Sequence, residues 1–154
     1  MFSSLPTGKA PIFLRLNRRF RLALFVAFSA LFVTGAVWLW ANAMKDTEGG
    51  EWYQAAAANL LMLHGGAAML TLMLLGALVP LHIQRAWRSN RNKVSGIAMV
   101  VVNAILIFTA FELYYSGSDS VRPWVSNLHV AFGLSLPLLL VVHILRGQMS
   151  RPIK

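Results

Sequence analysis

The sequence contains no cysteine and few charged residues. Without cysteine the chain has no disulfide bond, no thiolate zinc site, no cysteine-ligated iron–sulfur cluster and no covalently attached c-type haem. Charged residues make up only 12% of the 154 residues, whereas 57% are hydrophobic. A water-soluble chain of this length cannot bury so much apolar surface in its core. The composition therefore indicates an integral membrane protein.

Acidic residues are scarce as well, since five Asp and Glu stand against 14 Lys and Arg and the formal net charge is +9. Such an excess also occurs in nucleic-acid-binding proteins, so the placement of the charges decides its meaning. Twelve of the basic residues flank the apolar segments on one side: Lys9, Arg15, Arg18, Arg19, Arg21, Arg85, Arg88, Arg91, Lys93, Arg146, Arg151 and Lys154. Because cytoplasmic loops retain Lys and Arg, we expect both termini and the middle loop to be cytoplasmic, and no nucleic-acid partner.

Four apolar segments are each long enough to cross a bilayer, which takes about 20 helical residues. They run from about Phe20 to Met44, Tyr53 to Ile83, Val94 to Tyr115 and Trp124 to Leu145. The first is too long for the apolar region of a secretory signal, and further membrane segments follow it. Because the connecting loops are short and polar, consecutive helices are expected to be antiparallel neighbours. We predict an all-α fold in which a single transmembrane domain, residues 1–154, forms a four-helix bundle.

All four histidines fall on two of these segments, His64 and His82 on the second and His129 and His143 on the fourth. Segments two and four are expected to run in the same direction, from outside to inside. We call His64 and His129 the outer pair, and His82 and His143 the inner pair. The step from His64 to His82 corresponds to about 27 Å of α-helix, and the step from His129 to His143 to about 21 Å. Each step returns to nearly the same face of its helix. Histidines at two depths on two helices therefore form two candidate sites.

Each inner histidine is followed three residues later by an arginine, Arg85 or Arg146, which places the inner pair at one depth. Two imidazoles at one depth suit a haem, because the porphyrin supplies four nitrogens and the protein only the two axial ligands. Zinc and copper sites require more protein ligands than the two histidines of one pair provide. The arginines are candidates for pairing with haem propionates, although the positive-inside bias explains them without haem. A proton relay and simple polar packing of the imidazoles stay open as alternatives.

The pattern resembles the membrane cytochromes b, in which two helices of a four-helix core each carry two histidines that ligate two b-type haems. The stretch from Leu128-His129-Val130 to Val142-His143-Ile144 is similar to one of these helices. Leu63-His64-Gly65-Gly66 and Leu81-His82-Ile83 are similar to its partner. The resemblance covers nearly the whole chain and rests on four histidines and the topology.

The resemblance implies two haem b groups, with the outer and the inner histidine pair as axial iron ligands. It also implies a location in the bacterial inner membrane and electron transfer between the quinone pool and a partner redox protein. With both axial positions filled, the expected chemistry is electron transfer and not oxygen activation. The chain would then be an electron-transfer subunit of an oxidoreductase complex, working with other subunits, and not a stand-alone enzyme.

The second segment departs from the family, because 17 residues separate its histidines instead of about 13 and its span is about 6 Å longer at the usual helical rise. Tilt of the segment, or a distortion at Pro80 or Pro137, is expected to absorb the difference. Without it His64 would be unligated, and Met69 or Met62 would replace it. The inner haem is therefore expected to be more secure than the outer haem.

Two glycines, Gly65 and Gly133, lie close in sequence to the outer histidines and are candidates for contact with a flat macrocycle. Small residues also let membrane helices pack closely, which is the alternative explanation for both. Glu112 is the only acid within a predicted span, and it lies near Tyr114 and Tyr115 at the outer end of the third segment. These three residues form a candidate quinone and proton site. The alternative is an interfacial glutamate in water.

Other polar groups within the spans, such as Thr34, Thr71 and Asn103, are expected to hydrogen-bond between helices. Two further classes of function stay open. A non-redox membrane anchor or assembly subunit would use its histidines only for packing. A proton or metal-ion transporter needs a polar pathway between the histidines, and the apolar runs Ala67 to Val79 and Val130 to Val142 count against one.

Overall fold

A computed structural model of the chain describes residues 16–88 and 92–149. Its elements are α1 (Arg18–Met44), α2 (Gly50–Leu78), the π-helical turn η1 (Val79–Ile83), α3 (Gln84–Arg88), α4 (Lys93–Tyr115) and α5 (Arg122–Met149). α2, η1 and α3 are continuous and form one span of 39 residues. Within the described residues four helices are thus long and apolar enough to cross a membrane. The prediction of an all-α, multi-pass membrane protein is confirmed.

Two of the helices extend beyond the predicted segments at both ends. The second span begins at Gly50 and continues to Arg88, and the fourth begins at Arg122 and continues to Met149. Pro123 lies in the first turn of α5, where its missing N–H would have no intrahelical partner in any case. Helical hydrogen bonding continues through the polar flanks of each apolar run, and hydropathy alone does not reveal this.

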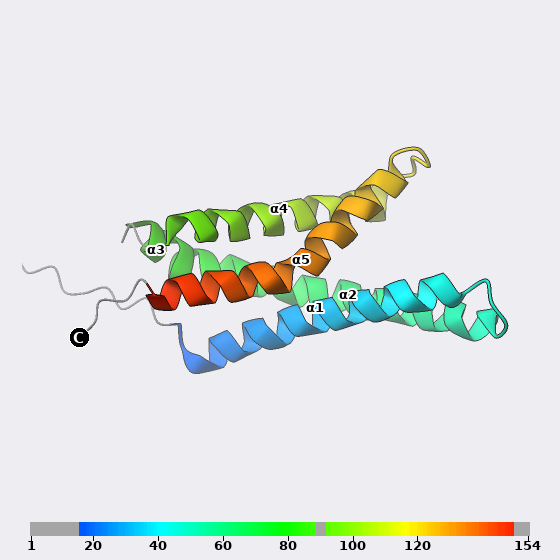
Figure 1. Ribbon diagram of the computed structural model, residues 1–154, viewed down its shortest axis with the longest axis horizontal. Helices are drawn as coiled ribbons and strands as arrows, with labels where there is room; N and C mark the ends of the chain where they lie inside the picture. The colour runs from blue at the N-terminus through cyan, green and yellow to red at the C-terminus, as the bar shows by residue number, and fades with distance from the viewer. Residues whose placement is uncertain (1–15, 89–91, 150–154) are drawn as a thin grey trace, which may run out of the picture.

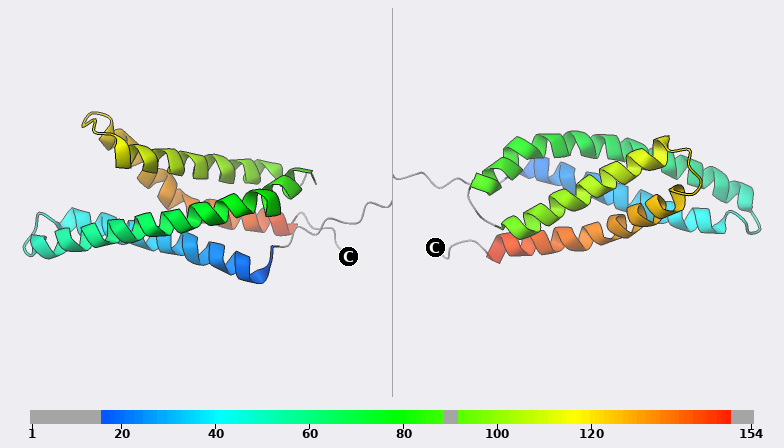
Figure 2. Two further views of the ribbon diagram at one scale, coloured as in Figure 1. Left: turned by 180° about the vertical axis from the view of Figure 1, so that it is seen from behind. Right: turned by 90° about the horizontal axis from the view of Figure 1, so that it is seen from above.

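The four spans form two antiparallel hairpins, α1 with α2 and α4 with α5 (Figure 1). Contacts within each hairpin are extensive, whereas those between hairpins are few and come mainly from α1 and α5. The start of α1, α3, the start of α4 and the end of α5 lie at one end of the bundle (Figure 2). At the opposite end the turns of the two hairpins lie apart (Figure 1).

The end of the bundle with the start of α1 carries the basic residues of the described chain that were expected to be cytoplasmic. Several other members of that set lie outside the described residues: Lys9, Arg15, Arg91, Arg151 and Lys154. The topology therefore gathers Arg18, Arg85, Lys93 and Arg146 at one end, as the antiparallel arrangement of consecutive spans requires.

Buried positions in the described bundle are mostly small or hydroxyl-bearing. The buried residues are Leu24, Ala27, Ala41, Ala57, Leu136, Thr71, Ser95 and Thr109. Small side chains let helix backbones approach closely, which is the main way helices pack in lipid. Large apolar side chains such as Phe108 and Leu138 are exposed on the surface of the bundle. That distribution suits a bilayer, where apolar surface needs no burial inside the protein.

The π-helical turn follows from Pro80. This residue has no N–H, so it cannot donate to the Gly76 carbonyl four residues earlier. The N–H of Val79 is shared between the Leu75 and Gly76 oxygens, and the N–H of Gln84 donates to the Val79 oxygen, five residues back. Such turns are rare in proteins, and those that occur are often found at functional sites.

The turn includes His82 and therefore changes the distance along the helix axis between His64 and His82. A wider turn advances less along the axis per residue than an α-helical turn, so it shortens the distance from His64 to His82. This is the distortion at Pro80 that the histidine spacing led us to expect. α5 is also bent (Figure 1), and Pro137 lies inside it, where a missing donor commonly kinks a helix.

Candidate functional site

The four histidine side chains meet in two pairs between the hairpins. The ring centroids of His64 on α2 and His129 on α5 are 6.3 Å apart, with the ring planes at 76°. The centroids of His82 on η1 and His143 on α5 are also 6.3 Å apart, with the planes at 86°. All four residues are half-buried. The structure thus brings together the outer pair and the inner pair that the sequence analysis defined.

Side chains, and not close backbone packing, connect the two helices that carry the histidines. α1 packs along α2 and α4 packs along α5, but α2 and α5 have few backbone contacts with each other. The paired imidazoles nevertheless approach to the same centroid distance at both levels. Each pair therefore links α5 to the second span through its side chains, at the same centroid distance.

A hydroxyl group from the neighbouring helix contacts His64. The Thr34 Oγ1 atom on α1 lies 3.0 Å from the Nδ1 atom of His64. Thr34 also donates its hydroxyl proton to the Ala30 carbonyl at 2.6 Å. A hydroxyl has one proton to donate, so Thr34 accepts the proton of the imidazole N–H. The Nδ1 atom of His64 is therefore the protonated ring nitrogen.

The second hairpin repeats this arrangement at His129. The Thr109 Oγ1 atom on α4 lies 2.8 Å from the Nδ1 atom of His129 and donates to the Ile105 carbonyl at 2.8 Å. The hydroxyl proton is again used within the helix of the threonine, so His129 donates its Nδ1 proton to Thr109. Both imidazoles of the outer pair are held in the same tautomer by a buried or half-buried threonine.

The inner histidine of α5 has a serine partner. The Ser95 Oγ atom lies 2.9 Å from the Nδ1 atom of His143 and donates to the Asn92 Oδ1 atom at 2.7 Å. The amide nitrogen of Asn92 in turn donates to the backbone carbonyl of His143 at 3.2 Å. His143 is consequently also a donor through Nδ1. Asn92 ties the start of α4 to α5 from a left-handed backbone conformation, φ 50°, that asparagine adopts more readily than most residues.

His82 differs from the other three histidines. Its Nδ1 atom is buried and has no hydrogen-bond partner among residues 16–88 and 92–149. For the other three, protonation of Nδ1 leaves Nε2 as the nitrogen with a free lone pair. A metal-bound histidine is typically held in this way, with its second ring nitrogen donating to a neighbouring acceptor. Three of the four imidazoles therefore have an Nε2 lone pair that could coordinate a metal.

A glycine follows two of the three hydroxyl residues and lies against the same imidazole. A Cβ atom added at Gly35, next to Thr34, would lie 3.2 Å from the Cε1 atom of His64. One added at Gly96, next to Ser95, would lie 3.9 Å from the Cε1 atom of His143. The first distance is tighter than ordinary van der Waals contact, so a side chain at position 35 would require the His64 imidazole to shift by a few tenths of an ångström.

The predicted glycines Gly65 and Gly133 lie in different surroundings. A Cβ atom at Gly65 would meet no protein atom within 4 Å, and one at Gly133 would only touch Leu106 at 3.9 Å. The two methionines considered as replacements for His64 are largely exposed, Met62 at 70% and Met69 at 69%. Because His64 itself meets His129, neither methionine is needed to complete the outer pair.

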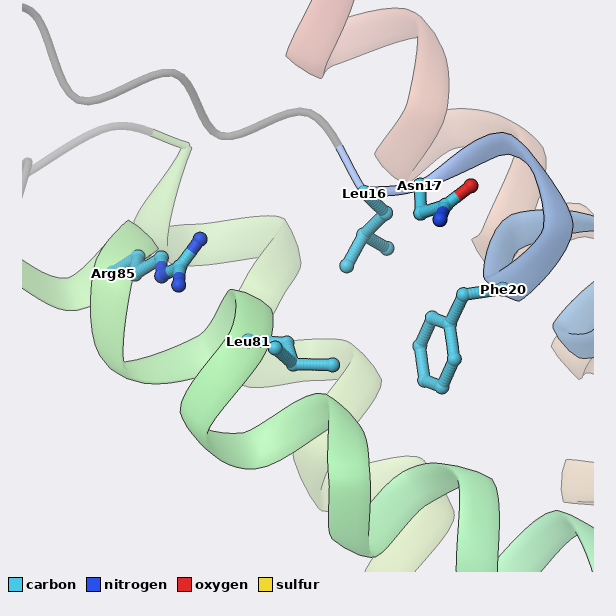
Figure 3. A pocket seen from close by; sticks show the side chains of 5 residues that line it. All are labelled: Leu16, Asn17, Phe20, Leu81 and Arg85. Carbon is cyan, nitrogen blue, oxygen red and sulfur yellow. The ribbon is translucent and has the colours of Figure 1, made fainter.

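The predicted arginines lie at the basic end of the bundle. Arg85 and Arg146 are both exposed. Arg85 lines a shallow pocket between the start of α1 and the π-helical turn, together with Leu16, Asn17, Phe20 and Leu81 (Figure 3). Leu81 directly precedes His82, so the pocket adjoins the inner pair along the chain.

The predicted proton and quinone residues gather at the C-terminal end of α4. The rings of Tyr114 and Tyr115 are 5.1 Å apart, and Phe111 lies 4.6 Å from Tyr115. Glu112 is exposed, and Tyr114 is 83% exposed. The group forms an aromatic surface patch and not an enclosed site.

Sequence reasoning missed Ser95, Thr109 and Asn92. A signal for two of them was present, because Ser95 and Thr109 are separated by 14 residues, the same step as His129 and His143. Equal steps on antiparallel neighbouring helices keep two pairs of residues in register.

Hydrogen bonds between helices were expected for Asn103, Asn127, Ser126, Thr34 and Thr71, and the structure shows one for Thr34. Thr34 does hydrogen-bond between helices, to His64. Thr71 and Asn103 were expected to do so but donate to carbonyls of their own helices, Ala67 and Met99 respectively. A polar group four residues after a carbonyl can bond it without any partner helix.

No protein family, curated protein or solved structure matches this chain.

Proposed function

We propose that this chain is a small membrane cytochrome b that carries electrons across the bilayer through two b-type haems. His64 and His129 would hold one haem, and His82 and His143 the other. The observation that carries the proposal is the hydroxyl contact to Nδ1 of three imidazoles. It leaves their Nε2 lone pairs available between two helices, at two levels.

The centroid distance within each pair fits two axial ligands of one metal. A metal–imidazole bond of about 2.0 Å and a distance of about 1.1 Å from nitrogen to ring centre on each side separate two centroids by about 6.2 Å. Both pairs have a centroid distance of 6.3 Å. The match at both levels supports one iron between each pair of imidazoles.

The donor set favours haem over a bare metal ion. Among the described residues no group of three or more His, Asp or Glu side chains gathers to bind a metal. Two imidazoles are too few for a structural zinc site, which takes four protein ligands. They are sufficient for a haem, whose porphyrin supplies the remaining four nitrogens.

Bound haem supplies reversible one-electron chemistry at its iron. The four histidines would hold the two haem irons, and the apolar side chains of α2 and α5 would exclude water from them. Arg85 and Arg146 would pair with haem propionates at the basic end of the bundle. Gly65 and Gly133 would allow a macrocycle edge to approach the backbone of α2 and α5.

The wider setting of the proposal comes from the charge pattern and the resemblance. Both termini would face the cytoplasm, in the inner membrane of a bacterium. Other subunits of a membrane redox complex would exchange electrons with the chain. Glu112, Tyr114 and Tyr115 would form the side of a quinone site at the outer surface, with Glu112 accepting a proton.

The test is a reduced-minus-oxidised absorption spectrum of the purified full chain, with haem and protein quantified in the same sample. The expected result is a b-type spectrum and two haems per chain. A variant without the histidines of α5, His129→Ala with His143→Ala, should be colourless while remaining in the membrane. A colourless wild-type protein, after expression with ample haem, would overturn the proposal and favour a non-redox anchor.

A more local prediction concerns Gly35. Gly35→Ala is expected to displace the His64 imidazole and to lower haem retention at the outer pair only, because the new Cβ would lie 3.2 Å from Cε1. Gly66→Ala is the matched control, since its Cβ meets no protein atom within 4 Å. Haem content after dialysis in detergent checks both variants. Equal retention in the two variants would contradict the role given to Gly35.

A further inference from the structure

The two histidine pairs are not equivalent. Each histidine of the outer pair donates Nδ1–H to a threonine hydroxyl, from Thr34 and Thr109. In the inner pair only His143 has such a partner, Ser95. The Nδ1 atom of His82 is buried without an acceptor in the described part of the chain.

The difference originates in α1. On α4 the residues Ser95 and Thr109, 14 positions apart, provide hydroxyls at both levels of the bundle. In the first hairpin the matching step is the 18 residues from His64 to His82, and 18 residues before Thr34 lies Leu16, just before the start of α1, whose side chain has no hydrogen-bonding group. The first hairpin therefore supplies one hydroxyl that contacts a histidine, and the second supplies two.

His82 also lies on a less regular backbone than the other three histidines. It belongs to the π-helical turn that follows Pro80, whereas His64, His129 and His143 lie within α-helices. The ring of His82 is thus fixed neither by a hydrogen bond to its second nitrogen nor by a regular helical turn. A buried polar atom without a partner also carries a desolvation penalty that a rotation of the ring could relieve.

We propose that Thr34, Thr109 and Ser95 are positioning residues for the haem ligands, and that the unsupported His82 makes the inner pair the weaker haem site. This inference rests on the proposed function. It reverses the order expected from the sequence, in which the longer step of the second span made the outer haem the less secure one. The hydroxyl contacts, and not the step length, set the order.

The test measures haem loss from the full-length protein in detergent to excess apomyoglobin. The expected time course has two phases of equal amplitude. The fast phase belongs to the inner pair and is therefore absent in His82→Ala. Thr34→Val and Thr109→Val should each accelerate the slow phase by about 10–100-fold, the usual cost of removing a partner of a metal-binding histidine.

Thr71→Val is the matched control, because Thr71 is buried and its hydroxyl donates to Ala67 of its own helix and not to a histidine. It should leave both phases unchanged. Thr34→Ser, which restores the hydroxyl, should return the slow phase and the midpoint potential of the outer haem to wild-type values, whereas Thr34→Val should shift that potential. A purely structural role of Thr34 would not move the potential.

Two results would overturn the inference and leave the proposed function intact: loss of both haems in one phase, or a fast phase that disappears in His129→Ala and not in His82→Ala. An effect of Thr71→Val equal to that of Thr34→Val would also overturn it. A protein that binds no haem would refute both the inference and the proposed function.

Discussion

Replacing His129 by alanine is expected to lower the haem content from two per chain to one, and replacing His64 should remove the same haem. The reason is geometric, since each iron needs both imidazoles of a pair and each pair has a centroid distance of 6.3 Å. His82→Ala and His143→Ala should in turn remove the other haem. Haem quantification, with redox titration to identify which centre is lost, checks all four variants.

Asn103→Ala is the control for loss of a polar side chain within a span. Asn103 lies on α4 and donates only to Met99 of its own helix. This variant should keep two haems and both midpoint potentials. The pairing would be refuted if His64→Ala and His129→Ala removed different centres, or if either variant kept both haems.

The second large effect concerns electron transfer across the membrane. Full-length protein in quinone-free vesicles, loaded with ferricyanide and treated with dithionite outside, should reduce the internal oxidant. His129→Ala and His143→Ala should each lower the rate to that of protein-free vesicles. The 14-residue step on α5 covers about 21 Å of a hydrocarbon core about 30 Å thick, so one remaining haem leaves most of the distance unbridged.

Asn103→Ala vesicles provide the comparison and should conduct at the wild-type rate. A wild-type rate in His143→Ala, with the inner haem verified as absent, would show that electrons do not pass through both centres. A protein with two haems that conducts no faster than empty vesicles would limit its role to one side of the membrane.

The spans could be predicted from the sequence because lipid imposes a simple rule. A helix that crosses the hydrocarbon must be apolar for about 20 residues, and four segments meet this condition. The rule does not determine where a helix ends in water, so the second span continued to Arg88 and the fourth to Met149. The flanking residues there are polar but remain helical.

The histidine pairing could also be predicted. Helical periodicity puts the histidines of each span on one face, and Arg85 and Arg146 put the inner histidines of the two spans at the same depth. The π-helical turn was predictable only as some distortion, since Pro80 removes a donor but does not dictate how the neighbouring carbonyls rearrange. Thr109 and Ser95 were missed because serine and threonine often bond their own helix, as Thr71 does. Only their separation of 14 residues, which equals that of His129 and His143, distinguished them from such residues.

The central claim is that two imidazoles, one from α2 or η1 and one from α5, coordinate the same iron at each level. An electron paramagnetic resonance spectrum of the oxidised protein tests this claim most directly. Ring planes at 76° and 86° predict two low-spin ferric signals of high anisotropy, because nearly perpendicular axial imidazoles leave the iron d orbitals close in energy. A high-spin ferric signal, or a single low-spin species in a protein with two haems, would contradict it.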